Sequence, residues 1–153
     1  LAGVKQLALD YDVVLADTGA GIGHDVLGFA ACADHVFVVT TPAATALTDT
    51  YGLIKALDTW GRETGREVPT PELVVNQVEG LEAAEATAAK LRRVCERFLC
   101  RNPRMAGWLP QAEQGRPGQT PARSRSSLYS HCLGRMSARV SRLLGSAAAD
   151  FSS

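Results

Sequence analysis

Apolar residues are arranged along the chain in two alternating patterns. Short unbroken apolar runs are separated by longer stretches in which apolar residues recur every three to four positions. The short runs predict buried strands and the longer stretches predict helices. The predicted strands span residues 13–16, 36–39, 73–75 and 105–110. This alternation is typical of the α/β class, and it predicts a parallel sheet flanked by helices.

Three stretches carry the helical pattern. The first spans residues 22–33 and the third spans residues 81–100, which are rich in good helix formers. The second follows Pro42, with Thr45 as its N-cap, and should end near Gly61. The faces predicted to be buried are, in order, Ile22, Val26, Phe29 and Ala33; Leu47, Tyr51, Ile54 and Leu57 or Asp58; and Ala84, Ala88, Leu91, Val94, Cys95 and Phe98.

The C-terminal stretch is polar before it becomes helical. Residues 111–127 are rich in Gly, Pro and Arg and predict a long mobile loop. Residues 128–145 predict a basic amphipathic helix, which either closes the domain or faces a membrane surface. Its apolar face holds Leu128, Cys132, Met136, Val140 and Leu143, with Arg135, Arg139 and Arg142 elsewhere on its surface.

The composition fits one compact domain. The chain has 153 residues, of which 46% are hydrophobic and 21% charged, which is enough to bury one core. No run approaches the roughly 18 unbroken apolar residues of a membrane span, and the first residues have no signal-peptide pattern. We therefore expect a cytoplasmic protein. The four cysteines lack CxxC spacing, which favours buried thiols over a zinc site or disulfides.

The formal net charge of zero conceals an uneven distribution. Residues 1–90 hold 5 Lys and Arg against 13 Asp and Glu, a net charge of −8. Residues 91–153 hold 11 against 3, a net charge of +8. Such a split either marks a basic region that meets nucleic acid or an anionic membrane, or lets two halves of one fold attract each other. We favour the second interpretation and predict no specific nucleic-acid partner.

The predicted strand at residues 13–16 runs into the motif Asp17-Thr18-Gly19-Ala20-Gly21. In P-loop nucleotide hydrolases, a carboxylate at the end of such a strand holds a magnesium-bound water, and a nearby glycine lets a backbone N–H approach the terminal phosphate. In retroviral-type aspartic proteases, Asp-Thr-Gly-Ala supplies half of a paired-carboxylate site. The helices that follow the motif argue against the protease, whose fold is almost wholly β. In a third interpretation, Asp17 only caps the next helix.

Three stretches taken together resemble the MinD/ParA family of P-loop ATPases. They are ADTGAGIGHDVLGF, ADHVFVVTTPAATALTDTYGLIKAL and LVVNQV. Within the second, the pattern TTP-x-x-T-x-x-TD-x-Y-x-x-IK is similar to the FlhG/FleN branch of flagellar-number regulators. The likeness extends from about Tyr11 to Pro110 in matching order and spacing. It implies that residues 1–153 are the C-terminal part of a single MinD-like nucleotide-binding domain.

The resemblance also implies roles for the residues of the DTGAG motif. Asp17 corresponds to the Walker B-like element, which serves catalysis and holds Mg²⁺ through water. Thr18, Gly19 and Gly21 correspond to nucleotide-binding positions, and Gly21 ends the switch segment that senses the γ-phosphate. The cofactors implied for the intact protein are therefore ATP and Mg²⁺.

On the other side of the implied nucleotide site, Asn76 resembles the asparagine that recognises the adenine ring. A side-chain amide suits this role because it offers a donor and an acceptor together. The alternative is that Asn76 is only a turn residue at the end of a strand. Pro110 resembles the segment that passes beside the base, although the aspartate usual after this proline is Gln111 here.

The phosphate-binding loop of the family, KGGxGK[ST], does not occur in these residues. The family architecture would place its strand between the strand ending at Asp17 and the strand ending at Thr40. Without that strand, ladder hydrogen bonds are lost on both sides and core is exposed. We therefore expect that this chain alone neither hydrolyses ATP nor folds with ordinary stability.

For the intact protein, the resemblance implies ATP binding and slow hydrolysis that switch a homodimer on and off. This activity serves to place or count flagella, to position division or to partition cargo, with peripheral contact at the inner face of the membrane through the C-terminal helix. Other classes stay open: a non-enzymatic interaction module, a truncated paralogue that pairs with an intact ATPase, and the aspartic protease. An upstream KGGxGK[ST] would favour the ATPase, and pepstatin-sensitive proteolysis would favour the protease.

Overall fold

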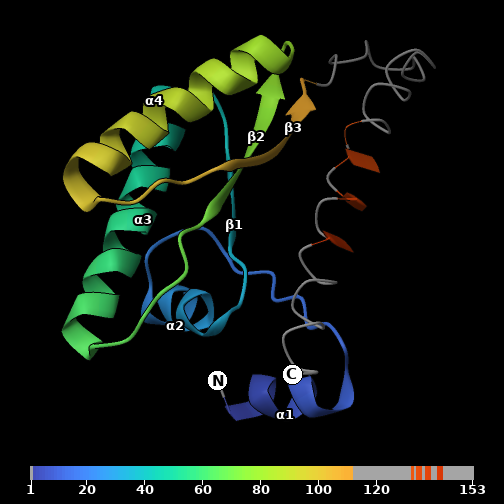
Figure 1. The fold of residues 1–153 in the computed structure, drawn as a ribbon, viewed down its shortest axis with the longest axis vertical. Coiled ribbons are helices and arrows are strands. Elements are labelled where there is room, and N and C mark those ends of the chain that lie inside the picture. The colour runs from blue at the N-terminus through green and yellow to red at the C-terminus, as the bar shows by residue number, and fades with distance from the viewer. Residues whose placement is uncertain (1, 112–131, 133, 136, 139–140, 143–153) are drawn as a thin grey trace.

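The computed structural model describes residues 2–111 and, beyond them, residues 132, 134–135, 137–138 and 141–142. In chain order the elements of residues 2–111 are α1 (Ala2–Asp10), α2 (His24–Cys32), β1 (Phe37–Thr40), α3 (Ala44–Thr64), β2 (Glu72–Val78), α4 (Leu81–Leu99) and β3 (Met105–Pro110). The strands form one parallel sheet in the order β1-β2-β3 (Figure 1). The predicted α/β class, a parallel sheet flanked by helices, is confirmed.

The central strand β2 is buried on both faces. Leu73, Val74 and Val75 are each at most 3% exposed, as expected of an unbroken apolar run in a parallel sheet. The register pairs Val38 with Leu73 and Thr40 with Val75. These four residues share one face of the sheet, and α3 and α4 both lie on that side (Figure 1).

The main core lies between this face of the sheet and the two long helices. Its buried members are Ile54, Leu73, Val75, Val78, Ala84, Ala88, Leu91, Cys95 and Leu99. The short side chains of Ala84 and Ala88 allow α4 to pack closely on β2. A second, smaller cluster joins α2 to α3 and the loop after it through Leu27, Leu57 and Val68.

The strand predicted at residues 13–16 is wrong for this structure, because these residues have no strand backbone. Their apolar side chains lie in the open, with Leu15 87% and Val13 42% exposed. A strand needs a neighbour for its N–H and C=O groups, and the neighbour implied by the family architecture is not among these residues. β1 is an edge strand of the described sheet, with Val39 62% exposed. Apolar side chains are therefore exposed on this side of the described sheet.

Helix α3 differs from its prediction at both ends. Its N-cap is Ala43, so Thr45 lies inside the first turn and does not cap the helix. The helix also passes through Gly61 and ends at Gly65, whose φ is 66°. Gly65 is the glycine that stops the helix, because a left-handed C-cap favours a residue without Cβ.

Gly61 has a packing role instead. A Cβ built on Gly61 would lie 2.9 Å from Val68 Cγ2 and 3.0 Å from the carbonyl oxygen of Arg66. The missing side chain therefore lets the chain after α3 return closely against the helix. The predicted buried face of α3 is confirmed at Ile54, Leu57 and Asp58.

The predicted buried faces of α2 and α4 are wrong in part. α2 begins at His24 and buries Leu27 and Gly28, while Ile22 lies before the helix and is 59% exposed. In α4, Val94 is 39% and Phe98 61% exposed. The buried face of α4 turns toward Thr87 and Leu99 instead, and it consists of Ala84, Thr87, Ala88, Leu91, Cys95 and Leu99.

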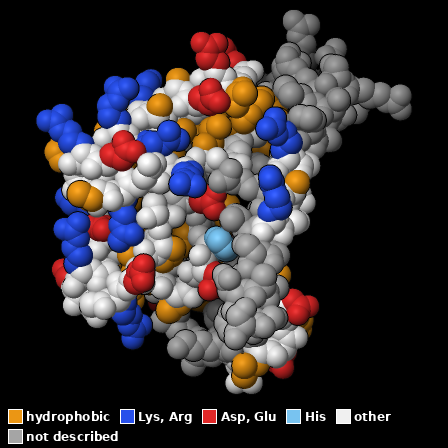
Figure 2. All heavy atoms as spheres, viewed as in Figure 1, with side chains coloured by type: hydrophobic (Ala, Val, Ile, Leu, Met, Phe, Trp, Pro, Cys, Tyr) orange, Lys and Arg blue, Asp and Glu red, His pale blue; other side chains and the backbone are white. Residues whose placement is uncertain are grey.

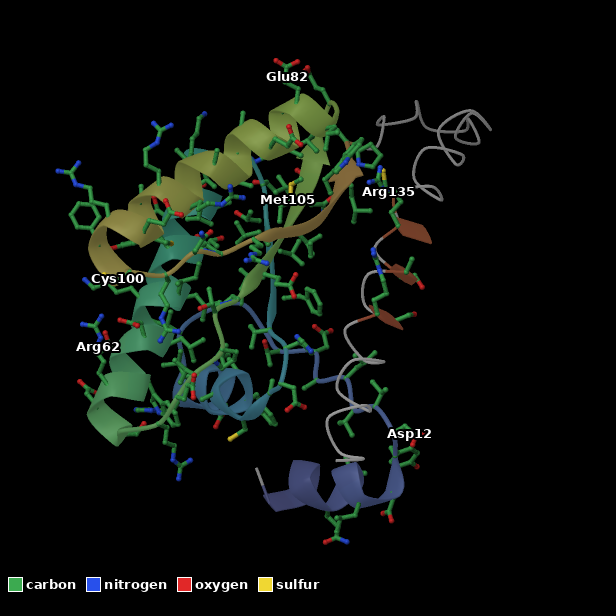
Figure 3. The ribbon with its side chains drawn as sticks, in the orientation of Figure 1. Asp12, Arg62, Glu82, Cys100, Met105 and Arg135 are labelled. Carbon is green, nitrogen blue, oxygen red and sulfur yellow. The ribbon has the colours of Figure 1, made fainter. Side chains whose placement is uncertain are left out.

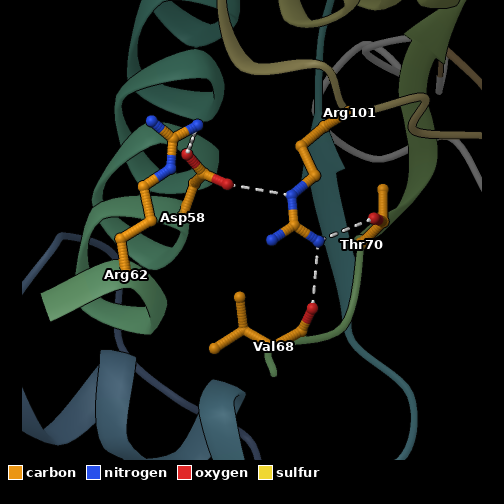
Figure 4. A network of polar contacts seen from close by, with 5 residues as sticks. All are labelled: Asp58, Arg62, Val68, Thr70 and Arg101. Atoms are coloured by element: carbon orange, nitrogen blue, oxygen red, sulfur yellow. Dashed lines mark hydrogen bonds and ion pairs between the residues drawn. The ribbon is translucent and has the colours of Figure 1, made fainter. Parts of the chain in front are cut away.

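A network of charged and polar groups ties α3 to two loops (Figure 4). The carboxylate of Asp58, whose side chain is only 6% exposed, accepts from Arg101 Nε at 2.9 Å and from Arg62 at 2.8 Å. Arg101 Nη1 also donates to the carbonyl oxygen of Val68 at 3.0 Å and to Thr70 Oγ1 at 3.2 Å. Arg101 therefore holds the loop after α4 to the loop after α3.

The predicted loop at 111–127 and helix at 128–145 fall almost wholly outside the described residues. The residues of this stretch that the structure describes have helical backbone: Cys132, Gly134, Arg135, Ser137, Ala138, Ser141 and Arg142. Cys132 is buried, and burial raises the pKa of its thiol, an effect that Arg135 opposes. None of the helices in the described parts of the chain is both long and apolar enough to cross a membrane.

Candidate functional site

The carboxyl ends of the three strands meet at one edge of the sheet, which is where open α/β sheets bind ligands. β1 ends at Thr40, β2 at Val78 and β3 at Pro110. The register pairs Val78 with Pro110. Two of the predicted nucleotide-binding residues, Asn76 and Pro110, are therefore brought to the same edge.

Asn76 lies in an irregular part of β2. Pairing with β3 passes from Val75–Trp108 to Val78–Pro110, with a register shift between the two. Over this interval β2 uses one residue more than β3, which is the arrangement of a β-bulge. Bulges occur next to active sites because they re-aim a side chain at the point where regular pairing stops.

The residue after Asn76 sets the direction of its side chain. Gln77 has a φ of 58°, a left-handed conformation that costs a residue with a Cβ about 1–2 kcal/mol. Its backbone N–H donates to Asn76 Oδ1 at 2.8 Å. This contact orients the half-buried amide of Asn76 and leaves its NH₂ group without a hydrogen bond inside the described part of the chain.

The residue after Pro110 is also held at this edge. Gln111 donates its backbone N–H to the carbonyl oxygen of Val78 at 3.0 Å, and its side chain is exposed. The position that usually holds an aspartate is therefore occupied by Gln111, whose backbone is anchored beside the end of β2.

The DTGAG segment is placed differently. Asp17, Thr18, Gly19 and Gly21 are exposed and belong to no helix or strand. Gly21 has a φ of 123°, and a Cβ there would meet no atom within 4 Å. The requirement for glycine at this position therefore comes from the backbone conformation, not from crowding.

The structure does not bring the DTGAG segment and Asn76 together. In Figure 1, residues 11–23 run from α1 past the lower end of β1 to α2, away from the arrowheads of β2 and β3. The predicted roles of Asp17, Thr18, Gly19 and Gly21 stay predictions, as do those of Asn76 and Pro110.

The described residues contain no group of three or more His, Cys, Asp or Glu side chains that could hold a metal ion directly. The role predicted for Asp17 needs only one carboxylate, because it acts through water. That carboxylate is exposed and makes no hydrogen bond or ion pair within residues 2–111. The aspartic-protease interpretation does not fit, because the molecule is α/β.

The sequence singled out Asn76 as a candidate but gave no sign of the part that Gln77 plays in orienting it. The left-handed backbone and the bulge hold the asparagine in place, and neither has a signal in the run LVVNQV, since glutamine does not favour positive φ. An Asn or Gly at position 77 would have predicted the turn.

Two curated proteins are similar to the chain, although no family model matches it. It is 33% identical over 112 residues to the antiactivator FleN of Pseudomonas aeruginosa, an alignment that covers 73% of this chain and 38% of FleN. It is 52% identical over 48 residues to the flagellum site-determining protein YlxH of Helicobacter pylori, which covers 31% of this chain and 16% of YlxH. The chain thus spans well under half the length of each of these relatives.

The parallel sheet with its helices and these two similarities define an α/β domain of the P-loop NTPase-like class. The chain belongs to the MinD/ParA family. Within it, the matches to FleN and YlxH support the FlhG/FleN branch of flagellar regulators.

Proposed function

We propose that the protein is an ATP-dependent spatial regulator of the MinD/ParA kind, acting on flagella, and that these residues supply the adenine side and the switch side of its nucleotide site. The observation that carries the proposal is the bulge at Asn76. A strained backbone at the carboxyl edge of the central strand points to a binding role, since such strain persists where it positions a functional group.

In this proposal Asn76 reads the edge of adenine. Adenine presents an acceptor at N7 and a donor at its 6-amino group. The free NH₂ of Asn76 supplies the matching donor, and the second lone pair of Oδ1 supplies the acceptor, because Gln77 N–H occupies only the first. Pro110 lies beside the same strand end through its pairing with Val78.

On the switch side, Asp17 is proposed to hold Mg²⁺ through a water molecule, and Gly21 to end the segment that senses the γ-phosphate. Mg²⁺ would neutralise charge on the phosphates when it is bound. Both residues are exposed in a segment without regular structure, so this proposal requires that segment to reorder around the nucleotide.

We further propose that residues 1–153 are the C-terminal part of one MinD-like domain and that the intact protein is a cytoplasmic homodimer with peripheral membrane contact through the helix at 128–145. The chain alone is expected not to hydrolyse ATP, because KGGxGK[ST] is absent from it. The intact mass of the native polypeptide tests the first point against 16.2 kDa. A mass larger by roughly ten kilodaltons or more supports it, and a native mass of 16.2 kDa contradicts it.

The adenine role is tested by titrating the intact native polypeptide with ATP and with inosine triphosphate, which lacks the 6-amino group. Wild type should prefer ATP by about five- to tenfold, and Asn76→Ala should abolish that preference, since one hydrogen bond to the base contributes about 1–1.5 kcal/mol. Asn102→Ala, an exposed asparagine before β3, is the matched control. An unchanged preference in Asn76→Ala would contradict the assignment.

A further inference from the structure

The exposed surface of α4 is divided lengthwise into two sides of opposite character. At 100° per residue, Glu82, Glu85 and Glu96 fall on one side of the helix. The adjoining side of the exposed surface carries no acidic residue, and we call it the basic-apolar face of α4. It consists of Lys90, Arg93, Val94, Arg97 and Phe98.

Two apolar side chains form the border of this face next to the buried side of the helix. Val94 and Phe98 are four positions apart, so they are neighbours on the helix surface. They are 39% and 61% exposed, although their spacing predicts burial in the core. Their exposure is unusual, because the helix beneath them is otherwise well packed, with Leu91 3% and Cys95 0% exposed.

The cations of this face are not neutralised by the protein itself. The ion pairs formed by Arg62 and Arg101 both use Asp58, and Lys90, Arg93 and Arg97 take part in no ion pair within the described residues. The guanidinium of Arg97 instead lies 5.3 Å from the centre of the Phe98 ring. Figure 2 shows Lys and Arg side chains gathered over α4 and the nearby end of α3.

We propose that the basic-apolar face of α4 docks an acidic amphipathic helix of a partner protein. Charge complementarity supports this occupant, because three unpaired cations lie along one side of an apolar pair, where acidic side chains of a partner could meet them. The geometry also fits, since Ala83 and Ala86 continue the same side toward the N-terminus of α4. Small residues there allow a second helix to approach, while Val94 and Phe98 supply side chains for its apolar stripe.

A membrane surface is the less suitable occupant. Helices that lie in a lipid interface bury a broad apolar face, and the broad apolar face of α4 is already used against the sheet. Only Val94 and Phe98 remain for contact with acyl chains, and alanines replace large apolar residues along the rest of this side. A partner helix can use a narrow stripe of this kind, which a bilayer cannot.

This docking site goes beyond the nucleotide function and does not rest on it. It lies on α4 and uses neither Asn76 nor the DTGAG segment, so the two proposals can fail separately.

The test uses the full 153-residue chain and a fluorescent synthetic helical peptide with leucines every three to four positions and glutamates on both flanks. Fluorescence anisotropy should detect binding to wild type and at least tenfold weaker binding to a peptide with lysines in place of glutamates. Phe98→Ser and the double variant Arg93→Glu with Arg97→Glu should each weaken binding of the acidic peptide about tenfold or more, as expected of anchor residues.

Matched controls separate this face from general effects. The double variant Lys55→Glu with Arg66→Glu makes the same charge change at exposed positions on α3 and in the loop after it. Leu9→Ser removes an apolar side chain that is 77% exposed on α1. Both should bind like wild type. All substituted side chains are exposed, so circular dichroism should show unchanged folding.

Three results would overturn the proposal. One is equal binding of the acidic and basic peptides, and another is unaltered peptide binding in the α4 variants. In the third, the chain does not bind the peptide. It instead binds phosphatidylglycerol vesicles, or self-associates in analytical ultracentrifugation, and loses that behaviour in Phe98→Ser. That result would assign the face to lipid or to a second copy.

Discussion

Cys95 and Cys100 are close in sequence and opposite in environment. Cys95 is fully buried in the main core, and burial, with a smaller effect of nearby Glu96, raises the pKa of its thiol from 9.0 to about 11. Cys100 is exposed at the end of α4, on the outside of the molecule (Figure 3). Because the thiolate is the reactive form, the two residues should differ strongly in reactivity.

Iodoacetamide at pH 8 should therefore alkylate Cys100 within minutes and leave Cys95 unmodified until the chain unfolds. Peptide mass spectrometry with and without denaturant measures this, with exposed Cys32 as a second reactive control. The raised pKa also means that the neutral thiol stabilises the fold below pH 9, and that this contribution is lost as the pH rises from 9.0 to about 11. Alkylation of Cys95 at the rate of Cys100 would contradict the packing of α4.

The two arginines on Asp58 should differ in their effect on stability. Arg101→Ala leaves a buried carboxylate with one partner and also removes the donor to Val68 and Thr70, so the free energy of unfolding should fall by about 3 kcal/mol. Arg62 is 69% exposed at its side chain, so Arg62→Ala should cost only about 0.5 kcal/mol. Urea unfolding followed by circular dichroism measures both. Equal losses would mean that Arg101 is not the principal partner.

At the scale of the element, two glycines of α3 make a matched pair. Gly61→Ala should destabilise the protein by about 1–3 kcal/mol, because the new Cβ meets Val68 and a backbone oxygen that cannot easily move. Gly52→Ala meets nothing within 4 Å and should stabilise the helix by about 0.5–1 kcal/mol. Thermal unfolding of the two variants gives the comparison, and stabilisation by both would contradict the close return of the chain at Gly61.

Element boundaries show what the sequence could and could not predict. The strands of the described sheet were predicted within a few residues, because unbroken apolar runs identify strands buried in a parallel sheet. Helix α1 was not predicted. The predicted N-cap at Thr45 and the predicted helix end at Gly61 were wrong. Ala43 and Gly65 have the required backbone conformations instead, and the sequence alone does not distinguish them from Thr45 and Gly61. The buried face of α4 was wrong at Val94 and Phe98, since periodicity does not specify how wide a face the sheet covers.

The candidate site was predictable only where its residues follow strands. Asn76 and Pro110 were singled out because they resemble residues of the MinD/ParA nucleotide site, and both lie at the carboxyl edge of the sheet. The bulge was not found, since it depends on pairing with β3. The strand before Asp17 was wrong for a tertiary reason, because an apolar run forms a strand only when a neighbour offers hydrogen bonds.

At the scale of the whole molecule, three strands and two clusters hold the fold together while several large apolar side chains stay exposed, including Leu9, Leu15 and Val39. The chain alone should therefore unfold with a free energy below about 5 kcal/mol, the lower limit for ordinary domains. Urea titration by circular dichroism and tryptophan fluorescence tests this value. A single cooperative transition well above that limit would show that the described core is sufficient.

The edge position of β1 has a consequence for behaviour in solution. Its outer backbone groups, beside Phe37 and Val39 at 37% and 62% exposure, present a template on which an extended segment from another molecule can add hydrogen bonds. At high concentration the chain should therefore precipitate by ordered cross-molecular β-pairing, not by unfolding. A lysine in place of Val39 would stand on the open face of the strand and keep the molecules in solution at little cost to the core.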